Sequence, residues 1–167
     1  MRRKDKIKRK RNSLTKELET IHIYVDGIEN NIIRKRIEHI LEWYIRKSTF
    51  YKNLFYWLSL LIIIINAMIP IINQIKFIYY NNIVSIISAV ASVFTGCITL
   101  FTMKDTWFRY RKSVELIKKE CMLFSSKDED YQDENRETLL IKNVENIISN
   151  ERQSWERMKF DKSSSKK

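Results

Sequence analysis

The sequence predicts an all-α membrane protein: a two-span transmembrane helical hairpin with an amphipathic N-terminal helix and a cytoplasmic C-terminal helical hairpin. Two apolar runs, of 22 and 21 residues, contain no charged side chain, and about 20 such residues are enough to cross a bilayer as a helix. Only two Gly and one Pro occur in 167 residues, whereas β and α/β folds need many more turn residues. Outside the apolar runs, apolar side chains recur at helical spacing.

Residues 1–27 are expected to form a basic, largely disordered segment. The first eleven contain eight basic residues and one acidic residue, and such a run repels itself. We expect it to bind anionic lipid headgroups, because no aromatic interleaving or nucleic-acid-binding motif accompanies the charges. Nucleic acid is therefore not an expected partner. Residues 21–25, IHIYV, fit a short extended piece but are too few to assign.

Residues 28–158 are expected to form a two-transmembrane domain. An amphipathic helix over residues 28–52 leads into a first span at about residues 54–75, and the second span covers about residues 83–103. At about 1.5 Å per residue, either span is roughly 30 Å long, which is the thickness of the hydrocarbon core. The apolar side chains that share one face of the first helix are Ile28, Ile33, Ile37, Ile40 and Tyr44.

Basic residues flank the spans unevenly. Only Lys76 lies between the spans, whereas the outer flanks contain Arg46, Lys47, Lys52, Lys104, Arg109, Arg111 and Lys112. By the positive-inside rule we expect a multi-pass protein of the cell (plasma) membrane with both termini in the cytoplasm.

Two further cytoplasmic helices are expected, at about residues 104–124 and 136–158, separated by an acidic polar loop. The first has an apolar face made of Trp107, Tyr110, Val114, Ile117, Cys121 and Phe124. The second has one made of Leu140, Val144, Ile147, Ile148, Trp155 and Met158. With the helix at residues 28–52, these faces can bury one another as a small bundle. Residues 159–167 are expected to be a disordered tail.

Six hydroxyl side chains follow one another along the second span at alternating steps of three and four: Ser85, Ser88, Ser92, Thr95, Thr99 and Thr102. Residues at this spacing lie on one face of a helix, and we call this set the hydroxyl stripe. It fits helix packing, since small residues and hydroxyls are common in the contacts between membrane helices. It also fits the lining of a water-filled pore in an oligomer, since two spans cannot enclose a pore alone, but the spacing by itself favours packing. Both interpretations stay open.

Asn66 and Pro70 mark a second polar position, near the middle of the first span. Proline lacks an N–H, so the Asn66 carbonyl, four residues earlier, loses its helical partner. This fits a kink or gate, or a contact between helices. Lys104, Asp105 and Arg109 would lie at the inner mouth of a pore. If the second span continued straight into the following helix, the hydroxyl stripe would extend to Thr106, Arg109, Ser113 and Glu120.

We expect no enzyme, no metal site and no cofactor. The sequence has no glycine-rich phosphate loop and no catalytic acid or base within the spans. Cys97 and Cys121 lack paired spacing, which argues against a disulfide framework and a zinc site. His22 and His39 have no further metal ligands at suitable spacing.

Two short stretches after the second span carry a family resemblance. They are WFRYRKSVELIKKE, with Trp107, Tyr110, Arg111, Glu115, Leu116 and Glu120, and ERQSW, with Glu151 and Trp155. With the two spans, this pattern resembles the SLATT family of two-transmembrane effectors, associated with SMODS and SLOG proteins, and the overlapping DUF4231 grouping of bacterial membrane proteins. None of these motif residues is catalytic, and we interpret their role as structural.

The resemblance implies a membrane effector of bacterial defence or conflict systems. Such an effector is expected to assemble as a homo-oligomer into a pore when a cytoplasmic sensor signals, often a sensor that makes or reads nucleotide messengers. The alternative is a membrane anchor or scaffold whose cytoplasmic helical bundle binds a soluble partner.

Overall fold

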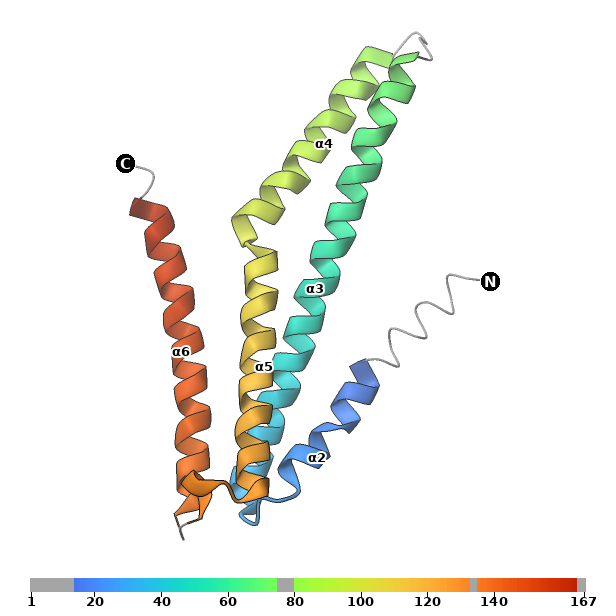
Figure 1. Cartoon of the computed structure of the whole chain (residues 1–167). Helices are drawn as coiled ribbons and strands as arrows, with labels where there is room; N and C mark the ends of the chain where they lie inside the picture. The colour runs from blue at the N-terminus through green and yellow to red at the C-terminus, as the bar shows by residue number, and fades with distance from the viewer. Residues whose placement is uncertain (1–13, 75–79, 133–134, 165–167) are drawn as a thin grey trace. The chain divides into compact units, whose positions relative to one another are not determined.

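The structure, a computed structural model, describes residues 14–74, 80–132 and 135–164 of the chain (Figure 1). The side chains of residues 73, 80–81, 101 and 158–164 are also left undescribed. The basic N-terminal run with its expected lipid contact, most of the short loop between the apolar runs and the last three residues therefore lie outside the described part. Within that part the protein is all-helical and contains no strand.

Two helical stretches are long and apolar enough to cross a membrane, Asn31–Ile72 and Asn82–Ser126. The first lies in α3 (Asn31–Gln74), and the second covers α4 (Tyr80–Phe101) and α5 (Met103–Ser126). In the most apolar 18-residue segment of each stretch, 0% and 6% of the residues are buried within the protein. The core helices of a globular fold are mostly buried, so these stretches differ from them. Pro70 lies inside α3, which continues past it to Gln74.

Thr102 separates α4 from α5. Its φ of 41° lies in the left-handed region, which a β-branched residue rarely adopts. The next helix begins at once, because the Thr106 N–H donates to the Thr102 carbonyl at 3.0 Å. The second apolar run therefore does not continue straight into α5, and the extension of the hydroxyl stripe to Thr106, Arg109, Ser113 and Glu120 does not follow.

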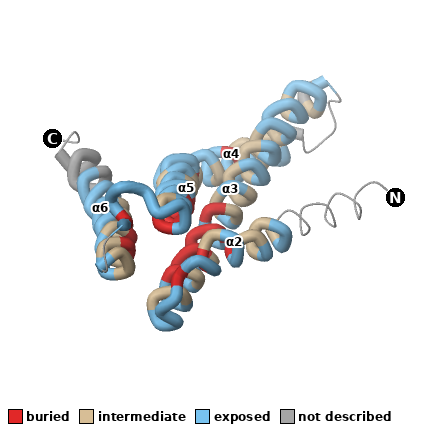
Figure 2. Tube along the Cα trace, turned by 60° about the horizontal axis from the view of Figure 1, so that its bottom comes forward, coloured by how far each residue is buried: buried red, intermediate tan, exposed pale blue. Residues whose placement is uncertain are grey.

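The described residues divide into two compact units, which we treat separately. Residues up to Ser48 and from Phe108 onward form the bundle unit, and Thr49–Trp107 form the apolar unit. In Figure 2 buried positions of the bundle unit lie on α2 (Ile21–Val25), the first half of α3, α5 and α6 (Arg136–Ser164). Its fully buried apolar side chains include Ile37, Leu41, Ile45, Val114, Ile117, Leu140 and Val144. Burying these side chains holds the four helices together.

The N-terminal segment is more ordered than its composition predicts. The expectation of disorder over residues 1–27 is wrong for residues 14–27, because residues 14–19 are helical and α2 follows at Ile21. Ile21 is 3% exposed and Val25 1% exposed, so both belong to the core of the bundle unit. The prediction of disorder gave more weight to the charge of the first eleven residues than to this apolar face.

Asn30 fixes the start of α3. Its Oδ1 accepts a hydrogen bond from the Ile32 N–H at 2.9 Å, which satisfies a free donor of the first turn. The Asn30 N–H in turn donates to Glu137 Oε1 at 2.8 Å, which links this position to α6. Ile28, expected to be the first helical residue, is buried but precedes the helix.

The segment between α5 and α6 contains a short 3₁₀ helix, η1 (Glu129–Tyr131). Its Tyr131 is 2% exposed and its ring packs edge-on to Phe124 with centroids 5.7 Å apart, so this acidic loop also contributes to the core. α6 continues to Ser164, so the expectation of a disordered tail from residue 159 is wrong for residues 159–164.

Candidate functional site

The hydroxyl stripe is largely exposed on α4. Ser85, Ser92, Thr95 and Thr99 are exposed, and Ser88 and Thr102 are half-buried. Three hydroxyls donate to carbonyls of their own helix: Ser92 to Ser88 at 2.9 Å, Thr95 to Ala91 at 2.9 Å and Thr99 to Thr95 at 3.0 Å. These bonds satisfy the hydroxyl donors without a second helix.

A different face of α4 is covered. Its buried and half-buried side chains include Val84, Ile87, Ala91, Phe94 and Ile98. Each precedes a stripe residue by one position, and one residue turns a helix by about 100°. The face that packs within the apolar unit is therefore apolar, and the hydroxyl stripe lies beside it.

Asn66 and Pro70 are both exposed on the second half of α3. A side-chain amide is costly in a lipid environment unless it meets protein or water. Because the Asn66 side chain is exposed on the apolar unit, it needs a polar partner outside this unit.

At the last residue of the apolar unit, Trp107 packs against α3. Its ring meets the Tyr56 ring with centroids 6.2 Å apart, and Lys52 Nζ lies 5.5 Å from the Trp107 centroid. Lys104 and Asp105, two of the three residues predicted for a pore mouth, are exposed nearby in the sequence. A cation–π contact of this kind adds about 0.5–1 kcal/mol at an exposed site.

In the bundle unit, Arg111 and Lys118 share one carboxylate. Arg111 Nη1 lies 2.6 Å from Glu17 Oε1, and Lys118 Nζ lies 3.0 Å from the same oxygen. Arg111 also pairs with Glu115 at 2.8 Å. Burial alone would raise the pKa of Glu17, but the hydrogen bonds from Lys118 and Arg111 outweigh it and lower that pKa.

Sequence reasoning missed this contact because Glu17 lies in the segment assigned to disorder. An available indication was the spacing of Leu14, Leu18, Ile21 and Val25, which are four, three and four residues apart. All four side chains belong to the core of the bundle unit or pack against it.

Glu120, Tyr131 and Asn143 form a second polar group. The Tyr131 hydroxyl donates to Glu120 Oε2 at 2.6 Å, and Asn143 Nδ2 donates to Glu120 Oε2 at 3.2 Å and to the Tyr131 hydroxyl at 3.0 Å. Burial, reinforced by the bond to Glu120, raises the pKa of Tyr131 above its usual range. This group joins α5, η1 and α6, so Glu120 has a structural role here.

Tyr131→Phe should lower the free energy of unfolding of the bundle unit by about 2 kcal/mol, since it removes a short hydrogen bond to a carboxylate from a buried hydroxyl. Hydrogen exchange of the full-length chain in detergent would measure this as lost amide protection in α5 and α6. Tyr24→Phe, which removes a hydroxyl outside the group, is the control. Equal protection in the two variants would contradict the role assigned to Tyr131.

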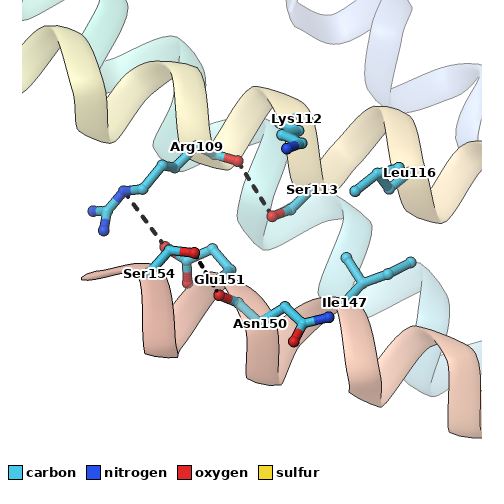
Figure 3. Close-up of a pocket in the computed structure, with 8 residues that line it drawn as sticks. All are labelled: Arg109, Lys112, Ser113, Leu116, Ile147, Asn150, Glu151 and Ser154. Atoms are coloured by element: carbon cyan, nitrogen blue, oxygen red, sulfur yellow. Dashed lines mark hydrogen bonds and ion pairs between the residues drawn. The ribbon is translucent and has the colours of Figure 1, made fainter. Parts of the chain in front are cut away.

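Arg109 and Glu151 face each other across a cavity of about 250 Å³ between α5 and α6 (Figure 3). Arg109 Nε lies 3.8 Å from Glu151 Oε1, and each side chain is 14% exposed. The cavity is also lined by Lys112, Ser113, Leu116, Ile147, Asn150 and Ser154. Burial raises the pKa of Glu151, although Arg109 and Arg152 oppose that shift. The structure thus places Arg109, the third residue predicted for a pore mouth, inside the bundle unit.

The remaining residues of the two motif stretches occupy varied environments. Tyr110 packs edge-on against Trp43 and Tyr44, with centroids 5.6 and 5.7 Å apart. Leu116 is 38% exposed and Trp155 is 44% exposed. Tyr110, Arg111, Glu120 and Glu151 thus each contact another helical segment of the bundle unit.

Cys121 is a free cysteine whose side chain is buried in the bundle unit. Burial raises the pKa of the Cys121 thiol to about 12, which keeps it protonated and weakly nucleophilic at neutral pH. Within the described ranges, no group of three or more His, Cys, Asp or Glu side chains is placed to hold a metal ion.

These features define an all-helical protein in which two helices long enough to cross a membrane are joined to a polar bundle with its own core. The chain belongs to the DUF4231 family, described as a protein family of unknown function, whose sequence model matches residues 39–138. That match confirms the DUF4231 resemblance. No curated protein shows significant similarity to the chain. No solved structure does so either.

Proposed function

We propose that the chain is an oligomeric, pore-forming or channel-like membrane effector. It crosses the cell membrane twice as a helical hairpin with both termini in the cytoplasm, and a partner or ligand acting on the bundle unit gates it. The charge-free runs support the two crossings, and the basic flanks support the orientation. The resemblance of its motif to the SLATT family supports a role in bacterial defence.

The observation that carries this proposal is the position of the hydroxyl stripe. Ser92 and Thr99 are exposed, while the neighbouring face with Ala91 is the one buried within the apolar unit. Hydroxyl side chains of membrane helices are enriched where a helix meets protein, and they can also line water, so this exposed face supports a contact beyond the single hairpin. In a ring of identical chains this face would line the central pore, because a single hairpin cannot enclose one.

Thr95→Leu and Ser92→Leu should abolish conductance when the full-length protein is reconstituted into planar bilayers. Each places a bulky apolar side chain on the pore wall, which narrows the pore and favours its dewetting. Val93→Leu is the matched control, because Val93 is 65% exposed on α4 but lies off the hydroxyl stripe. Chemical cross-linking checks that all three variants still assemble. If both stripe variants pass the same current as the wild-type protein, the hydroxyl stripe does not line a pore.

A membrane anchor or scaffold is the second candidate. The bonds from Ser92, Thr95 and Thr99 to their own helix favour it, because hydroxyls satisfied in this way tolerate lipid without a pore. In that case the purified protein passes no ions, and the bundle unit binds a soluble partner. Trp155, 44% exposed, is a suitable position for such a contact, and Trp155→Ala would then release the partner while conductance is absent in every variant.

A further inference from the structure

The cavity between α5 and α6 contains a buried cation, Arg109, part of whose hydrogen-bonding capacity is unused. Nε and Nη1 of Arg109 are buried and have no hydrogen-bond partner within the described part of the chain. A guanidinium stays protonated at physiological pH, so Arg109 cannot escape this cost by losing its charge. Since buried polar groups in native proteins are nearly always hydrogen-bonded, two unpaired donors on one cation indicate a missing acceptor.

Glu151 does not supply that acceptor. Its Oε1 is 3.8 Å from Arg109 Nε, which is beyond hydrogen-bond distance although close enough for attraction between the charges. The ion pair is therefore incomplete.

The charges and donors around the cavity favour an anion over water. Arg109 and Lys112 contribute two positive charges to its wall and Glu151 one negative charge, which leaves one positive charge in excess. Asn150 adds a side-chain amide to the same wall. Water can accept hydrogen bonds from the free N–H groups but carries no charge. An oxyanion accepts the same hydrogen bonds and also neutralises the excess positive charge, and hydrogen bonds between ions are stronger than those to water.

The size of the cavity limits the ligand. Pockets for drug-sized ligands measure about 300–1,000 Å³, and this cavity, at about 250 Å³, lies below that range. It suits a tetrahedral oxyanion such as phosphate, with little attached to it. Such a group can come from solution or from a lipid headgroup, because Arg109 lies two residues after Trp107, where the apolar unit ends.

We propose that the cavity between α5 and α6 is a phosphate-binding site in which Arg109 is the main ligand and Glu151 is the carboxylate that the anion displaces. Binding completes the hydrogen bonds of Arg109 and weakens its pairing with Glu151. The contact between α5 and α6 then responds to the anion. This site goes beyond the proposed pore, because a chain that only anchors a partner would bind phosphate in the same way.

Titration calorimetry with inorganic phosphate tests the site, using the full-length chain in uncharged detergent at constant ionic strength set with chloride. We expect saturable binding that Arg109→Gln weakens about tenfold or more, since it removes a charge-assisted hydrogen bond. Arg157→Gln, an equal charge change at an exposed position of α6, should leave affinity unchanged. Glu151→Gln should tighten binding several-fold because it removes the competing carboxylate.

A second arm distinguishes the source of the phosphate group. The chain is placed in nanodiscs of neutral lipid with and without phosphatidic acid, and its thermal stability is measured. A stabilisation by phosphatidic acid that Arg109→Gln abolishes, without binding of inorganic phosphate, assigns the site to a lipid headgroup. The proposal is overturned if neither probe binds, if Arg109→Gln and Arg157→Gln behave alike, or if Glu151→Gln weakens binding. Circular dichroism of Arg109→Gln excludes misfolding as the cause of lost binding.

Discussion

Leu140→Ala should destabilise the bundle unit by about 2–5 kcal/mol, which is the usual cost of truncating a fully buried leucine. Leu140 is 0% exposed and belongs to the apolar core shared by α2, α3, α5 and α6. The change leaves a cavity in this core, which the surrounding side chains fill only in part. Hydrogen exchange of the full-length chain should show the loss of protection in α5 and α6 together, since they share this core.

The control for this variant is Met122→Ala. Met122 is 53% exposed on α5, so its truncation should change the free energy of unfolding by less than about 0.5 kcal/mol. If both variants lose the same protection, Leu140 does not lie in a shared core and α6 is only loosely attached to the bundle unit.

Glu17→Ala should cost about 2–3 kcal/mol, because it removes the hydrogen bonds that Lys118 and Arg111 donate to this carboxylate. Lys118 is the sensitive partner, since its side chain is only 11% exposed. The helix at residues 14–19 should detach from α5, and hydrogen exchange should report faster exchange there and in α2. Glu19→Ala is the matched control, because Glu19 lies in the same short helix and is exposed.

The same contact predicts a dependence of stability on pH. Because the pKa of Glu17 is lower in the folded chain than its ordinary value of 4.5, the stabilisation is present at neutral pH. It is lost as the pH falls below that value and Glu17 takes up a proton. Glu17→Gln should remove this part of the acid sensitivity. An unchanged acid profile in Glu17→Gln would show that Glu17 does not stabilise the bundle unit.

Much of the helical architecture could be predicted from the sequence. The charge-free runs predicted two helices long enough to cross a membrane. The regular recurrence of apolar residues predicted which side chains of α3, α5 and α6 line the core, among them Ile37, Val114 and Leu140. These predictions succeed because helical periodicity is a local property. The ends of the chain were predicted poorly, because charged composition was given more weight than the short apolar spacing of residues 14–25.

The pairing of polar residues could not be predicted in the same way. Arg111 and Glu115 are four residues apart on one helix, so their contact follows from the sequence alone. Glu17 meets Lys118 across 101 positions, and Tyr131 meets Glu120 from a loop, so only the fold brings them together. The motif residues were recognisable, but their partners were not.

The sequence by itself determined the helical class, the family and the existence of one polar face on α4, because each depends on residue type and spacing along a single segment. The tertiary structure decided that Ala91 is buried while Ser92 is exposed, and that α4 stops at Thr102. It also enclosed Arg109 beside Glu151 instead of leaving it at the end of an apolar helix. The physical reason is that burial and charge pairing depend on which faces meet, and helical periodicity does not specify this.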